Sequence, residues 1–156
     1  MNTETSWVND PSLSEVKLTY SARPDAKDYP ILDCPEDIYG YLSDAFDQNT
    51  LDYQEQFIVL LFNSTLRVIG WSKISAGGKS ATVVDIPMVV QLALLSNASS
   101  VVIAHNHPDR TLRPSAADIN LTKRIKKALD TLTIRLNDHL IITRGEYYSF
   151  KEHGRL

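Results

Sequence analysis

Cysteine is nearly absent from the sequence, and long apolar runs are absent altogether. One cysteine, Cys34, occurs among 156 residues, which excludes an internal disulfide framework and speaks against a zinc site built from thiolates. No apolar run approaches the roughly 20 residues of a membrane-spanning helix. Residues 1–5 are polar and acidic and lack the apolar core of a signal peptide. We therefore expect a soluble cytoplasmic protein with no membrane partner, in which any metal ion is held by histidine and carboxylate groups.

An excess of positive charge is also missing. The chain carries 16 Lys and Arg against 19 Asp and Glu, a net charge of −3, so the protein as a whole is not a phosphate-binding polycation. Its length suffices for one domain with a proper core. We expect residues 1–34 to form an extension with a strand at 15–20 and a linker at 21–30, and residues 35–156 to form the domain itself.

The order of apolar and amphipathic stretches predicts a mixture of helices and strands. Helix starts are indicated at Asp33, Asp85 and Ser115, and the first helix is expected to end near 47–49. The expected strands are 57–62, 66–71, 80–84, 101–104, 140–143 and 147–150. Because hairpins occur together with strand–helix–strand units, the expected fold class is α/β or α+β with a mixed sheet.

The most informative stretch begins where the strand at 101–104 ends. Side chains of a strand alternate between its faces, so His105 and His107 point the same way, with Cα atoms roughly 6–7 Å apart. Ser115 then opens a helix that carries Asp118 in its first turn. Two imidazoles and one carboxylate can therefore converge and leave a fourth position for water, which is the arrangement of a catalytic zinc site.

Each part of this pattern also has a purely structural interpretation. Ser115 followed three residues later by Asp118 has the spacing of a capping box, in which the two residues satisfy each other's backbone amides. A histidine at a strand end is often a hydrogen-bonded surface residue. The residue types alone therefore leave both metal binding and a structural role open.

The complete spacing, His-x-His-Pro followed after six residues by Ser-x-x-Asp, resembles the zinc signature of the JAB/MPN+ (JAMM) metalloprotease superfamily. The form at 105–108, His-Asn-His-Pro, resembles the RadC branch of that superfamily. So do Gln-Glu-Gln-Phe at 54–57, Asp-His-Leu-Ile-Ile at 138–142 and Tyr-Ser-Phe at 148–150. The resemblance covers about residues 35–156. It implies a curved mixed sheet flanked by helices, and zinc-dependent hydrolysis of a peptide or isopeptide bond in a peptide or protein substrate.

The resemblance also implies a role for each site residue. The zinc ligands are His105, His107 and Asp118, with water in the fourth position. Glu55 is the general base, which takes a proton from the water and later delivers it to the leaving amine. Ser115 donates to the developing oxyanion. Without the resemblance, Glu55 is an ordinary solvated strand start and Ser115 a helix cap; Glu36 is a weaker candidate base because it already serves a helix start.

The chain departs from the RadC pattern in two places. Asp109-Arg110 stands where Ser-Gly is usual, so the loop loses a flexible glycine and gains two charges, while every ligand is retained. RadC-like proteins often carry a helix-hairpin-helix DNA-binding module ahead of the JAB domain. The residues before position 35 are too few for such a module, and we expect the branch that lacks it.

Other functions remain open from the sequence. The RadC branch is associated with DNA repair, so the chain is alternatively a nuclease or a non-catalytic DNA-associated module. The basic residues of 123–127 offer contacts to phosphates, although charged helix faces are usually just solvated. A third alternative is a binding module that has lost turnover, against which the intact ligands and base speak.

Two further histidines have no assigned role. Asp138 and His139 follow the helix that begins at 116, and they are a structural pair, an outer contact of the site or an alternative ligand set. His153 lies in the polar C-terminal stretch and carries no evident function.

Overall fold

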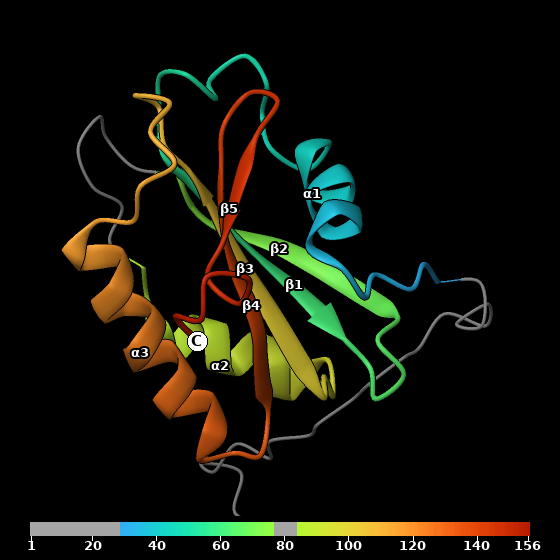
Figure 1. The fold of residues 1–156 in the computed structure, drawn as a ribbon. Coiled ribbons are helices and arrows are strands. Elements are labelled where there is room, and N and C mark those ends of the chain that lie inside the picture. The colour runs from blue at the N-terminus through green and yellow to red at the C-terminus, as the bar shows by residue number, and fades with distance from the viewer. Residues whose placement is uncertain (1–28, 77–83) are drawn as a thin grey trace, which may run out of the picture.

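The computed structural model describes residues 29–76 and 84–156. The predicted strand at 15–20, and most residues of the predicted linker at 21–30 and the predicted strand at 80–84, lie outside these ranges. Along the described chain the elements follow in this order (Figure 1): α1 (Pro35–Ser43), β1 (Gln56–Phe62), β2 (Val68–Ala76), α2 (Ile86–Leu95), β3 (Ser100–Asn106), α3 (Ala116–Asp130), β4 (Arg135–Ile142) and β5 (Tyr147–Ser149).

Five strands form one mixed sheet in the order β2-β1-β3-β4-β5. β3 and β4 run parallel, and every other neighbouring pair is antiparallel. Parallel neighbours need a crossover connection, which α3 provides here. This arrangement confirms the α+β class with a mixed sheet in a single domain. It also brings the N-terminus of α3 to the edge of the sheet where β3 ends.

Helices cover both faces of the sheet, with α1 on one side and α2 and α3 on the other (Figure 1). Every residue of β1 and β3 is buried, which explains why the runs 57–62 and 101–104 are apolar on both faces. Alternate residues of β3 pack on opposite sides, Val102 toward α1 and Ile103 toward α2 and α3. Among the described helices, none is long and apolar enough to cross a membrane.

α1 is shorter than predicted. It ends at Ser43 rather than near 47–49, and Cys34 takes the N-cap position one residue after the predicted cap. The amide of Ala45 donates to the carbonyl of Leu42 at 2.8 Å. This contact spans three residues rather than four, so it tightens the chain and ends the regular helix.

β4 starts earlier than predicted, at Arg135 rather than within 140–143. Its first half contains the polar residues Asn137, Asp138 and His139, which conceal a strand from any search for apolar runs. Asp138 and His139 are nevertheless 1% and 0% exposed. They are tolerated inside the protein because polar groups of neighbouring elements contact them.

Candidate metal centre

β3 delivers the first histidine to the α3 side of the sheet. His105 pairs with Phe57 of β1 and Ile141 of β4, and it is 1% exposed. The rings of Phe57 and His105 are stacked with centroids 6.3 Å apart. Beyond the strand, the amide of His107 donates to the carbonyl of Ile142, so the chain stays beside β4 for one more residue. The two histidines therefore project from one rigid edge.

The N-terminus of α3 fixes the carboxylate. Ser115 is the N-cap of α3, and its Oγ accepts a hydrogen bond from the amide of Asp118 at 3.1 Å. In return, Oδ2 of Asp118 accepts a hydrogen bond from the amide of Ser115 at 2.7 Å. The capping box anticipated from the sequence is thus present. It does not compete with the metal hypothesis, because it orients the carboxylate toward both histidines.

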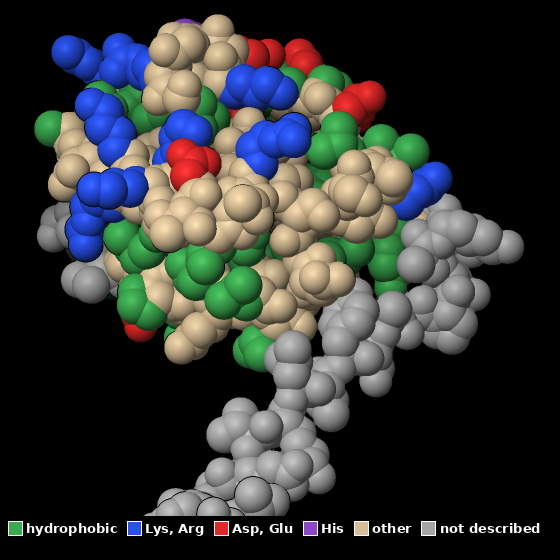
Figure 2. Space-filling view, turned by 90° about the horizontal axis from the view of Figure 1, so that it is seen from below, with side chains coloured by type: hydrophobic (Ala, Val, Ile, Leu, Met, Phe, Trp, Pro, Cys, Tyr) green, Lys and Arg blue, Asp and Glu red, His purple; other side chains and the backbone are tan. Residues whose placement is uncertain are grey.

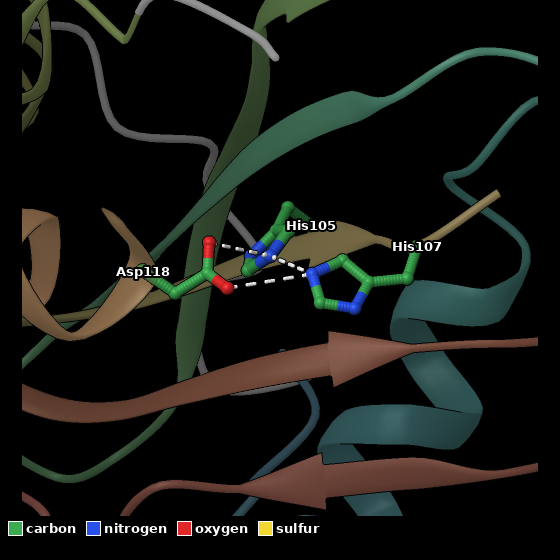
Figure 3. Close-up of side chains that lie close together, drawn as sticks. All are labelled: His105, His107 and Asp118. Atoms are coloured by element: carbon green, nitrogen blue, oxygen red, sulfur yellow. Dashed lines mark hydrogen bonds and ion pairs between the residues drawn. The ribbon is translucent and has the colours of Figure 1, made fainter. Parts of the chain in front are cut away.

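The three side chains converge on one point (Figure 3). Nε2 of His105 and Nε2 of His107 are 3.0 Å apart, and they lie 3.2 and 3.5 Å from Oδ1 and Oδ2 of Asp118. Ligand atoms bound to a tetrahedral zinc at about 2.0–2.1 Å lie roughly 3.3 Å from each other. The separations observed here match that value, so the donor set and its geometry fit a zinc ion with a position left open.

A second group of ligand-type residues exists among the described side chains, formed by Asp33, Cys34 and Asp37. It lies at the start of α1, and its two carboxylate residues are exposed. Such acidic helix starts are common without any ion, and nothing else at this place indicates a ligand.

The electrostatics of the converging group favour a cation between its members. Burial opposes ionisation of Asp118, but its contacts with the imidazoles of His105 and His107 outweigh burial and hold the pKa of Asp118 well below its usual range. Burial likewise opposes protonation of His107, yet hydrogen bonds to the Asp118 carboxylate and the Thr111 carbonyl raise the pKa of His107. A proton or a metal ion is therefore stabilised at the same place.

In the loop after His107, a residue other than glycine adopts a backbone conformation that glycine usually occupies. Arg110 has φ of +63°, a left-handed conformation that costs a non-glycine residue about 1–2 kcal/mol. Two contacts hold it: Asp109 accepts hydrogen bonds from the amide and hydroxyl of Thr111, and Arg110 forms a 2.7 Å ion pair with Asp52. The loop therefore presents the Thr111 carbonyl to Nδ1 of His107 at 2.8 Å.

The candidate base is not a member of the converging group. Glu55 is half-buried and immediately precedes β1. β1 and β3 pair with Phe57 opposite His105, so Glu55 lies two residues along the chain from the partner of a histidine of the centre. Among the described residues, Glu55 is outside the set whose ligand atoms lie within 4.8 Å of one another. Glu36 sits in α1 on the opposite face of the sheet, where it contacts Tyr147.

Asn106 secures the segment that contains Glu55. Its side chain points away from the histidines, toward α1, and is fully buried. Oδ1 accepts a hydrogen bond from the amide of Gln56 at 2.7 Å, and Nδ2 donates to the carbonyls of Leu51 and Gln54 at 2.6 and 2.9 Å. The end of β3 and the start of β1 are thereby joined through one amide side chain.

We predict that Asn106→Asp destabilises the fold by about 2–4 kcal/mol, because a carboxylate cannot donate to the two buried carbonyls and faces both of them. Urea unfolding at neutral pH measures the change. Asn63→Asp is the matched control, because Asn63 uses only Oδ1, as an acceptor for Thr65 and Arg67, and it should shift stability by less than about 0.5 kcal/mol. Equal effects of both changes would show that the Asn106 amide is not needed.

Asp138 and His139 are joined through the backbone, because Oδ1 of Asp138 accepts a hydrogen bond from the amide of His139 at 2.7 Å, but their side chains make different further contacts. Asp138 accepts hydrogen bonds from Oγ of Ser149 at 2.5 Å and from the amide of Lys151 at 3.0 Å, and burial raises the pKa of Asp138. His139 instead contacts Nδ1 of His105 at 2.8 Å. His139 is an outer contact of the centre and lies outside the group of ligand atoms. His153 stacks on Tyr148 and contacts the carbonyl of Ser149, with no link to the centre among the contacts described.

Comparison with known proteins gives a consistent set of relatives. The family model described as RadC-like JAB domain matches residues 32–155. A UPF0758 protein of Porphyromonas gingivalis is 45% identical over 104 residues, which cover 66% of this chain and 46% of the relative. UPF0758 protein YfjY of Escherichia coli is 42% identical over 103 residues, 66% of this chain and 64% of the relative. A UPF0758 protein of Pseudomonas fluorescens is 36% identical over 126 residues, which cover 81% of this chain and 55% of the relative.

The chain spans about half the length of the curated relatives it matches. The names of these relatives state no activity and no metal.

Proposed function

Since the chain belongs to the RadC-like JAB domain family, we propose that it is a zinc-dependent metallohydrolase that cleaves an amide bond in a peptide or protein substrate. One observation carries the proposal. The Nε2 atoms of His105 and His107 and the two carboxylate oxygens of Asp118 face one another at 3.0–3.5 Å in a place that stabilises a cation. Histidine and carboxylate are ligands that zinc accepts, and a fourth position stays free for the reaction.

A bound Zn²⁺ supplies Lewis acidity, which makes water a nucleophile near neutral pH and polarises a carbonyl. The protein's own residues do the rest. Glu55, in a segment that Asn106 fixes on both sides through Gln54 and Gln56, takes the proton of the attacking water and passes it to the leaving amine. Ser115 already accepts a hydrogen bond through its oxygen, and its hydroxyl proton is directed to the developing oxyanion.

A cleavage screen tests the proposal. The full chain, prepared in metal-free buffer and loaded with zinc, is incubated with a fluorogenic peptide library and an isopeptide library. Cleavage is expected with zinc, is lost after chelation, and returns when zinc is added back. His107→Ala, prepared in parallel, is the control for a contaminating protease, because a contaminant would still cleave the libraries in the variant preparation. Cleavage that survives chelation or the substitution would not belong to this site.

We predict that zinc affinity rises with pH and levels off above the pKa of His107. That pKa is raised, so below it a proton occupies the Nε2 that the metal needs, and proton and metal compete. Affinity should fall by about tenfold for each pH unit below the pKa. Asp118 adds no pH dependence in this range, because its lowered pKa keeps it ionised. Competition titrations with a chelator from about pH 6 to about pH 8 measure the slope.

His153→Ala is the control for the pH dependence, because this histidine contacts only Tyr148 and the Ser149 carbonyl among the described contacts. It should leave the slope unchanged. A flat profile in the wild type would remove His107 Nε2 from the ligand set.

A second candidate function, association with nucleic acid, draws on the surface of α3. Lys123, Arg124 and Lys127 are exposed on this helix, and Lys and Arg side chains gather on that side of the molecule in Figure 2. The net charge of −3 opposes it. We predict no sub-micromolar, sequence-dependent affinity for duplex or single-stranded DNA at physiological salt, measured by fluorescence anisotropy. Such an affinity would promote the nucleic-acid function over the hydrolase.

A further inference from the structure

A buried chain of hydrogen bonds runs behind His105. Nδ1 of His105 lies 2.8 Å from Nε2 of His139, and Nδ1 of His139 lies 2.6 Å from Oγ1 of Thr122. Oγ1 of Thr122 in turn donates to the carbonyl of Asp118 at 2.6 Å. His105, His139 and Thr122 are 1%, 0% and 2% exposed. This row of hydrogen bonds connects β3, β4 and α3. It ends on the backbone carbonyl of Asp118, whose carboxylate faces His105.

Counting donors and acceptors shows which atom donates in each of these hydrogen bonds. The Asp118 carbonyl can only accept, so the single hydroxyl proton of Thr122 points to it and the hydroxyl oxygen is left as an acceptor. Nδ1 of His139 therefore carries its proton toward Thr122. In the neutral imidazole the other nitrogen, Nε2, is then an acceptor, and it receives the Nδ1 proton of His105. The lone pair of His105 is left on Nε2, the atom that faces His107 and Asp118.

The surroundings of His139 fix its ring. It is stacked on Phe150 with centroids 4.5 Å apart and an interplanar angle of 13°, and Phe57 lies on another side at 6.3 Å. These apolar rings leave the two nitrogens to the contacts with His105 and Thr122. Nδ1 of each histidine of the centre thus has a different partner. The loop carbonyl of Thr111 sets His107, whereas His105 depends on how α3 and β4 dock against β3.

We propose that Thr122 and His139 are positioning residues, which hold His105 in the tautomer whose Nε2 lone pair is directed into the metal centre and so set the affinity for the metal. The proposal rests on the metal centre put forward above. If the direction of the chain reversed, His139 would donate from Nε2 to His105, and the His105 proton would move to Nε2. That proton would occupy the position that a metal ion needs.

The tautomers can be measured without any metal. Long-range ¹H–¹⁵N correlation spectra of the metal-free full-length protein distinguish a protonated ring nitrogen from a bare one, at a pH about two units above the ordinary histidine pKa of about 6.5. We expect both His105 and His139 to carry the proton on Nδ1. In Thr122→Val, which keeps the shape but removes the hydroxyl, His139 loses its acceptor, and a population with the proton on Nε2 of His105 should appear.

Zinc affinity supplies the second readout. Thr122→Val should bind zinc about 10–100-fold more weakly, the usual cost of losing an outer hydrogen bond of a metal-binding histidine. Thr122→Ser is the matched control, because it restores the hydroxyl and should restore both the tautomers and the affinity. Thermal unfolding of the metal-free variants confirms that each is folded. A merely structural role would alter that unfolding without changing tautomers.

Two results would overturn the proposal. One is a wild-type His139 with its proton on Nε2. The other is a folded Thr122→Val protein with wild-type zinc affinity and an unchanged His105 tautomer. Failure of the metal centre itself gives a different pattern, in which the wild type binds no zinc while its tautomers are still measurable.

Discussion

Replacing His107 by alanine is expected to remove most of the zinc, from about one ion per chain in the wild type to a small fraction. The imidazole belongs to one of the three residues proposed as ligands, and its Nε2 lies 3.0 Å from Nε2 of His105 and 3.5 Å from Oδ2 of Asp118. Only His105 and Asp118 would then remain to bind the ion, which is too few for tight binding. Mass-spectrometric metal analysis of protein purified in metal-free buffer, then given one equivalent of zinc and desalted, measures the loss.

The control for this substitution is His153→Ala, which removes a histidine that stacks on Tyr148. It should retain the zinc of the wild type. Stability gives an independent readout, because a ligand that binds the folded state alone raises the unfolding temperature. Zinc should raise that temperature for the wild type and for His153→Ala but not for His107→Ala. Equal zinc in His107→Ala and wild type would show that His107 is not a ligand.

The convergence of the three side chains could be predicted because each part follows from a local rule. Strand alternation aligns His105 with His107, and the structure keeps both on the α3 side of β3. The capping box puts Asp118 at a fixed place in the first turn of α3. Only the short loop between them was undetermined, and there the sequence could not show that Arg110 adopts a left-handed conformation.

The buried contacts behind the centre could not be predicted in the same way. A threonine inside a helix and a histidine in a strand have ordinary explanations, and nothing local connects Thr122 with His139. Their contact needs the parallel register that pairs Ile103 with His139, together with the docking of α3 on that face. The polar first half of β4 hid this strand as well, since its burial depends on partners from other elements.

Glu55→Gln is expected to separate metal binding from catalysis. The substitution keeps the volume and most of the hydrogen-bonding shape of the side chain but removes the carboxylate that accepts a proton. Glu55 does not belong to the group of ligand atoms, so zinc content should stay at the wild-type level. Turnover of a substrate from the library screen should fall by roughly 10²–10⁴-fold, the usual contribution of a general acid–base group.

Asp118→Asn should behave differently. An amide oxygen can still accept the hydrogen bond from the amide of Ser115, so the cap and the fold should survive. The negative charge between the two histidines is lost, however, and both zinc content and turnover should fall. Glu152→Gln, at an exposed position near the C-terminus, is the neutral control for removing one carboxylate. The three variants together separate loss of a ligand, loss of a base and loss of charge.

The outcomes for Glu55→Gln are distinct. If it loses zinc as severely as Asp118→Asn, Glu55 is a ligand or a structural residue, and the proton transfer proposed for it is wrong. If it keeps both zinc and full turnover, another acid is the base. Glu36 is not that other acid, because it belongs to α1, which lies on the opposite face of the sheet from the histidines. Retained zinc with a large loss of turnover is the result expected of a base that is not itself a ligand.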